Sequence, residues 1–119
     1  MSGAATQLDR DVDERTHLVE VEGEFDFGDG ELLTQRIIDL MYGGRQCFVV
    51  DLSAVEALDT RAITPLLRAA KRLSYRNGRL ALVTSITSRL ADSDLDRVLE
   101  LAATQEEALA KLAASRTPR

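Results

Sequence analysis

The chain has 119 residues, of which 15 are Lys or Arg and 20 are Asp or Glu, so its formal net charge is −5. This length suits one compact domain with a single core. Aromatic residues make up only 4% of the chain, and Trp is absent. A general nucleic-acid binder needs a basic face and aromatic side chains for base stacking, so that class is excluded. We therefore expect a protein partner.

The single cysteine, Cys47, cannot form an intrachain disulfide, which favours a reducing compartment. The N-terminal residues 1–17 contain no apolar core of signal-peptide length. No segment approaches the ~18 continuous apolar residues that a membrane helix requires. We expect a cytoplasmic protein that does not associate with a membrane.

The first half of the chain predicts a hairpin followed by a helix. Residues 6–12 and 16–22 alternate apolar with polar side chains, which is the period of a half-buried strand. Residues 23–30, "GEFDFGDG", combine three glycines with three acidic residues, a composition typical of a loop. An amphipathic helix follows from residue 31, and Gly43 and Gly44 end it.

The middle of the chain predicts buried strands that alternate with helices. Residues 46–52, "QCFVVDL", are apolar up to Asp51, as expected of a strand that is buried on both faces. A helical stripe of apolar residues runs from Ile63 to Arg76, and a further buried strand covers residues 79–84. The other side of this helix carries basic residues, namely Arg68, Lys71, Arg72 and Arg76.

The C-terminal part predicts two more helices and an edge strand. Residues 85–93 are a short helical candidate, and residues 95–102 could hold the edge strand. Residues 104–115 form the last helix, because Thr104 and Glu107 have the spacing of a capping box. The element order describes an α/β protein with a mixed sheet and helices packed against it.

Few residues support catalysis or a cofactor. The only histidine, His17, lies in a strand pattern, where we expect it to be exposed or half-buried, and Cys47 lies among apolar neighbours as a buried thiol. The glycines of residues 23–30 lack the spacing of a phosphate-binding or calcium loop. We predict no enzyme activity, no cofactor and no metal site.

One enzyme-like alternative concerns the end of the central strand. Asp51 and Asp59 lie there, where open α/β sheets place their ligands and where receiver domains carry a phosphorylated aspartate. Such a site also needs a pair of acidic residues for magnesium, and no such pair precedes this strand.

The segment "ALDTRAITPLL", residues 57–67, joins this strand to the next helix. If the helix begins at Thr60, the hydroxyl caps it and stabilises it by about 1 kcal/mol. A second possibility makes Thr64 the cap and Pro65 the first helical residue. A helix N-terminus also accommodates phosphate, so a phosphorylated Thr60 would be tolerated while it adds nearly two charges beside Asp59. A structural cap and a binding switch both remain open.

Four stretches together resemble the STAS domain, the fold of bacterial anti-sigma factor antagonists and of sulfate-transporter tails. They are "VEGEFD" followed by a helix, "FVVDLSAVEALDT", "LLRAAKRLSYRNGRLALV" and "LDRVLELAATQEEAL". The resemblance covers residues 6–114 and leaves residues 1–5 and 115–119 as tails. It implies a mixed sheet of four to five strands with about four helices.

The resemblance also implies a phosphorylation site. In the family, an Asp-Ser-Ser-Gly or Asp-Ser-Thr-Gly motif follows the central strand, and the anti-sigma factor kinase phosphorylates the hydroxyl directly after the Asp. Asp59 and Thr60 match these two positions. Arg61 stands where the family has Ser or Thr, and Ala62 adds a methyl where the family has Gly.

The implied partner is an anti-sigma factor of the serine-kinase type. The implied docking surface includes the exposed face of the helix that follows the motif, together with Asp26, Asp59, Thr60, Arg61, Ala62 and Thr64. The changed motif also leaves an alternative, a STAS scaffold or interaction subunit of a signalling complex without a phosphorylation switch.

Overall fold

The structure is a computed structural model that describes residues 6–84 and 99–115. Its five strands form one sheet in the order β1-β2-β3-β4-β5. The strands are β1 (Thr6–Asp11), β2 (Thr16–Phe25), β3 (Cys47–Leu58), β4 (Arg79–Val83) and β5 (Leu99–Ala102). The helices are α1 (Phe27–Tyr42), the short 3-10 turn η1 (Thr60–Ala62), α2 (Ile63–Ser74) and α4 (Gln105–Ser115). β1 pairs antiparallel with β2, and the other strand pairs are parallel.

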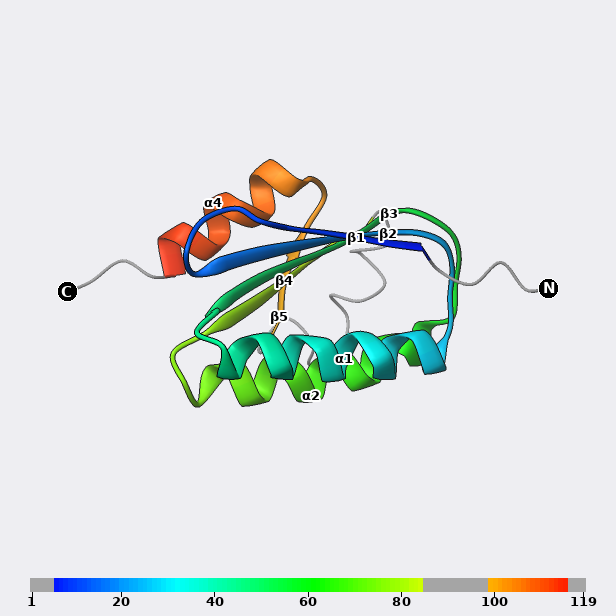
Figure 1. Ribbon diagram of the computed structural model, residues 1–119. Helices are drawn as coiled ribbons and strands as arrows, with labels where there is room; N and C mark the ends of the chain where they lie inside the picture. Colours follow the sequence, from blue (N-terminus) through cyan, green and yellow to red (C-terminus); the bar gives the residue numbers. More distant parts are fainter. Residues whose placement is uncertain (1–5, 85–98, 116–119) are drawn as a thin grey trace.

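The sheet lies between two layers of helix (Figure 1). α1 and α2 lie side by side on one face, and α4 covers the other. Alternate residues of β3 serve the two faces: Phe48 and Val50 belong to the core under α1 and α2, whereas Cys47 and Val49 belong to the core under α4. This explains why residues 47–50 at the start of the strand are all apolar, and it confirms the predicted buried strand and the buried Cys47. β3 then continues beyond the predicted residues 46–52 to Leu58, and this second half is largely exposed.

The described residues confirm a mixed α/β fold with a five-stranded sheet. The N-terminal hairpin is also confirmed: its turn is held by Asp13, whose Oδ1 accepts the N–H groups of Arg15 at 2.8 Å and of Thr16 at 2.9 Å. The helical candidate at residues 85–93 lies outside the described residues. Among the residues that are described, no helix is long and apolar enough to cross a membrane.

The predicted loop at residues 23–30 is wrong. β2 continues to Phe25, and α1 begins at Phe27 directly afterwards. Asp26 is the N-cap: its Oδ1 accepts the N–H of Asp29 at 2.9 Å, and Asp29 Oδ2 accepts the N–H of Asp26 at 3.1 Å. This reciprocal pair supplies partners for the free backbone groups of the first turn, so the glycines there do not prevent the helix.

The last helix, α4, is capped close to the predicted way. Thr104 Oγ1 accepts the N–H of Glu107 at 3.1 Å. The return bond is displaced by one residue, because Glu107 Oε1 accepts the N–H of Ala103 at 2.9 Å. Gln105, at the start of α4, donates to the carboxylates of Glu20 at 2.6 Å and Asp51 at 2.5 Å, which ties the helix to β2 and β3.

Candidate partner-binding site

Asp26 and Asp59 each follow the carboxyl end of a parallel strand. Phe25 and Leu58 are the last paired residues of β2 and β3, and the N–H of Asp59 donates to the carbonyl of Phe25 at 3.0 Å. The N-terminus of α1 and the turn η1 therefore begin next to each other at one edge of the sheet. This is the edge where open α/β sheets place functional residues.

Neither Thr60 nor Thr64, the two residues that we predicted as N-cap, caps α2. The N-cap of α2 is Ala62, which makes no side-chain capping bond, and Thr64 is the second residue of the helix. Helical structure does begin at Thr60, but as the 3-10 turn η1. Pro65 is the third residue of α2, within the first turn, where its missing N–H is tolerated.

Asp59 supplies the cap that the prediction assigned to a threonine. Its Oδ1 accepts the backbone N–H of Arg61 at 3.0 Å, and its carbonyl accepts the N–H of Ala62 at 2.8 Å. Aspartate is as good a capping residue as threonine, so the sequence signal was present but was assigned one residue too late.

Arg61 folds back onto the same carboxylate. Its Nη2 donates to Asp59 Oδ2 at 2.8 Å, and its Nε lies 3.1 Å from Oδ1. The side-chain bond from Arg61, together with its backbone N–H, lowers the pKa of Asp59. The Arg61 side chain is 80% exposed, and we therefore treat the ion pair as weak and exchangeable.

Gly30 of α1 holds the turn in place, and sequence reasoning missed it. A Cβ atom at Gly30 would lie 2.3 Å from the carbonyl oxygen of Ala62, so only glycine lets α1 approach η1 this closely. Ala62 is itself fully buried. Its methyl therefore does not add to the outer surface of the domain, and a contact between Ala62 and a partner stays a prediction.

The remaining predicted positions are accessible to different degrees. Asp26, Arg61 and Thr64 are exposed, and Asp59 is partly exposed. The structure brings Asp26, Asp59 and Arg61 to one edge of the sheet, next to the backbone of Thr60. We call Asp26, Asp59, Arg61 and Thr64, together with the backbone of Thr60, the switch surface.

Two titratable residues singled out in the sequence lie elsewhere. Asp51 is buried in β3, where Oδ1 accepts both the N–H and the hydroxyl of Ser53 at 2.9 and 2.6 Å, so its carboxylate is occupied by structural bonds. His17 is buried rather than exposed or half-buried, with Nδ1 2.7 Å from Asp11 Oδ1 and Nε2 3.3 Å from Asp9 Oδ1. Within residues 6–84 and 99–115, no three His, Cys, Asp or Glu side chains gather as metal ligands would.

Comparison with known proteins identifies the fold family. The family model for the STAS domain matches residues 7–108, most of the chain. The chain belongs to the STAS domain family. No curated protein sequence matches it. Among solved structures, this STAS domain is similar to an anti-sigma factor antagonist from Mycobacterium paratuberculosis, with a TM-score of 0.76 and 26% identity over 95% of this chain and 99% of that one.

Two further structures share the fold. One is the anti-sigma factor antagonist SpoIIAA in its unphosphorylated form, with a TM-score of 0.70 and 20% identity over 91% of this STAS domain and 98% of that chain. The other is the Bacillus cell fate determinant SpoIIAA in its phosphorylated form, with a TM-score of 0.69 and 19% identity over 89% and 98% of the two chains.

Proposed function

We propose that this STAS domain is an anti-sigma factor antagonist that binds an anti-sigma factor of the serine-kinase type. Binding frees the sigma factor, and phosphorylation of Thr60 by the partner ends the interaction. Catalysis belongs to the partner, and this domain is its ligand and substrate. The most informative support is the similarity to an anti-sigma factor antagonist over 95% of the chain.

The switch surface supports this proposal through its position. The turn η1 starts at Thr60 directly after β3, and the adjoining Asp26, Arg61 and Thr64 are exposed. A partner can therefore reach the surface without unfolding the sheet. A phosphate on Thr60 would add up to two negative charges beside Asp59, changing the surface that the partner must contact.

Arg61 gives the switch a specific electrostatic consequence. In this structure its guanidinium neutralises Asp59. A phosphate on Thr60 would carry up to two negative charges and would compete with Asp59 for the exposed guanidinium of Arg61. The added phosphate makes the surface more negative, whereas the movement of Arg61 changes which of the two anions is left unpaired.

The test uses the purified full chain with an anti-sigma factor kinase from the same organism and ATP. We expect the unmodified protein and Thr60→Ala to bind the kinase, and the phosphorylated protein to bind much more weakly in isothermal titration calorimetry. Thr64→Ala is the matched control, because Thr64 is an exposed threonine in the first turn of α2. Phosphorylation that survives Thr60→Ala but is lost in Thr64→Ala would overturn the assignment.

A second candidate is a STAS scaffold without a phosphorylation switch. The observation that favours it is Arg61, which stands in place of the family's second hydroxyl residue and already occupies Asp59. In that case the kinase would bind the protein equally well with and without ATP, and Thr60→Ala would have no effect.

A further inference from the structure

A groove between α1 and α2 begins near the switch surface and has a cavity volume of about 370 Å³. Its α1 side is formed by Glu31, Thr34, Gln35 and Ile38, and its α2 side by Arg68 and Arg72. We propose that this groove binds an acidic side chain from a segment of the partner protein. The inference rests on the proposed function only in assuming that the partner is a protein.

The charge of α2 favours an acidic occupant. α2 carries Arg68, Lys71 and Arg72 and no acidic residue, although the net charge of the whole chain is −5. Arg72 makes no ion pair or hydrogen bond with any residue that the structure describes. Arg68 has one ion pair, to Glu31 at 3.5 Å, and both side chains are more than half exposed. Such a long and exposed pair leaves Arg68 free to exchange partners.

The groove combines an apolar side chain with polar and charged ones. Ile38 is partly buried and packs against the core, so it offers an apolar wall for the methylene groups of a Glu or Asp side chain. Thr34 is 7% exposed, and its hydroxyl oxygen is buried with no hydrogen-bond partner among the described residues. The two arginines that line the groove favour an anionic occupant over an apolar one.

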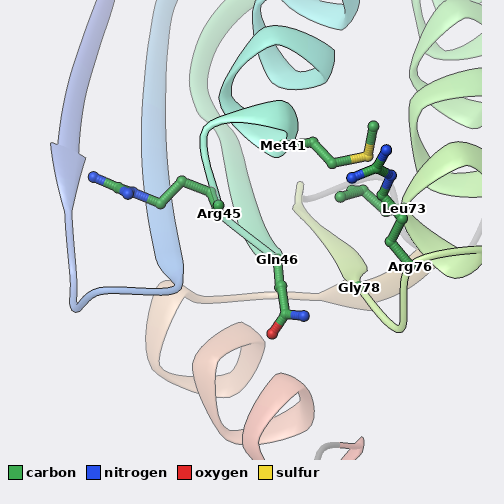
Figure 2. A pocket seen from close by; sticks show the side chains of 7 residues that line it. Met41, Arg45, Gln46, Leu73, Arg76 and Gly78 are labelled. Atoms are coloured by element: carbon green, nitrogen blue, oxygen red, sulfur yellow. The ribbon is translucent and has the colours of Figure 1, made fainter.

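A second hollow in the helical layer lacks these features. It has a volume of about 130 Å³ and lies at the C-terminal ends of α1 and α2. Figure 2 shows that Arg45, which lines it, extends away toward β1, where it pairs with Asp11 at 2.7 Å. Arg76 lies over the ring of Tyr42, 4.7 Å from its centroid. Both arginines there are therefore already engaged, in contrast to Arg72.

The probe is a capped peptide with the sequence Ala-Glu-Leu-Glu-Ala, and its uncharged counterpart carries Gln in place of both Glu residues. Binding to the full chain is followed by amide chemical shifts in NMR. We expect the acidic peptide to shift Thr34, Ile38 and Arg72, with a Kd on the order of 1 mM that suits one or two charge-assisted contacts. The Gln peptide should cause no such shifts.

Two matched variants distinguish binding in the groove from general attraction to the positive charge of α2. Arg72→Gln and Lys71→Gln remove the same charge from neighbouring exposed positions, but only Arg72 lines the groove. We expect Arg72→Gln to weaken peptide binding by about fivefold, because it removes one exposed charge-assisted contact. Lys71→Gln should weaken peptide binding by less than about twofold. Unchanged melting temperatures would verify that both variants fold.

Four outcomes would overturn the inference. They are no binding of the acidic peptide, shifts outside the groove, equal losses in the two variants, and binding of free glutarate as tight as that of the peptide. The last would show that the occupant is a small acid. None of these outcomes bears on phosphorylation of Thr60, which is measured separately.

Discussion

The hydroxyl groups of Thr34 and Thr104 differ in their hydrogen bonding. Thr34 has a buried hydroxyl without a partner among the described residues, whereas Thr104 caps α4. Valine has nearly the same shape as threonine. We expect Thr34→Val to leave the free energy of unfolding unchanged or to raise it by up to about 1 kcal/mol, because an unsatisfied buried hydroxyl disfavours the folded state.

Thr104→Val is the control for that substitution, and it should lower the free energy of unfolding by about 1 kcal/mol through loss of the cap. Chemical denaturation of both variants and the parent protein provides the comparison. If Thr34→Val were the more destabilising of the two, the Thr34 hydroxyl would have a partner that the structure does not show.

The stability of the domain should depend on pH through the carboxyl group of Asp11. Arg45 donates two hydrogen bonds to Asp11, and together with His17 it lowers the pKa of that carboxyl below its ordinary value. A carboxyl whose pKa is lower in the folded state stabilises the fold above the unfolded-state pKa of about 4. This stabilisation is lost as the pH falls through the lower, folded-state pKa.

We therefore expect the melting temperature to decline between about pH 5 and pH 2, and Asp11→Asn to make that decline shallower. Glu56→Gln, a change at an exposed residue of β3, serves as the control and should leave the slope as it is. An identical slope in Asp11→Asn and the parent would contradict the assigned role of Arg45.

At the scale of elements, the close approach of α1 to η1 depends on one glycine. Gly30→Ala would place a Cβ atom 2.3 Å from the carbonyl oxygen of Ala62, which forces the two elements apart. We expect a loss of about 1–3 kcal/mol in the free energy of unfolding, as for other overpacked sites, even though alanine favours helix.

Gly28→Ala is the matched control in the same helical turn, because its Cβ would meet only Asp26 Oδ1 at an ordinary 3.5 Å. It should be neutral or stabilise the protein by up to about 1 kcal/mol. Amide shifts of η1 should change in Gly30→Ala and not in Gly28→Ala. Equal stabilities of the two variants would refute the contact.

The elements that the sequence predicted well have strong local signals. Period-2 alternation predicted the hairpin, the apolar run from Cys47 predicted β3, and Gly43 and Gly44 marked the end of α1. The start of α1 was missed because its first turn contains Gly28 and Gly30, which resemble a loop. Only the capping box formed by Asp26 and Asp29 distinguishes this first turn from a loop. That signal is local in the sequence, but it is weak.

At the scale of the whole molecule, the element order predicted a mixed sheet with helices packed against it, and the family resemblance supplied the number of strands. Because β3 is apolar on both faces, its sequence does not tell which residues face α4. The site was predicted as Asp26 together with residues 59–62 and Thr64. Two features of the site were not predicted. Ala62 is buried because it packs against α1, and Arg61 forms an ion pair with Asp59 because the turn brings the two side chains together.

The proposed function of this STAS domain depends above all on phosphorylation of Thr60. The most direct test is intact mass measurement with peptide mapping of the protein purified from its native host, alongside Thr60→Ala and Thr64→Ala. We predict one phosphate, located on Thr60, present in Thr64→Ala and absent from Thr60→Ala. Partners captured with no phosphate on Thr60 under any growth condition would contradict the switch and support the scaffold.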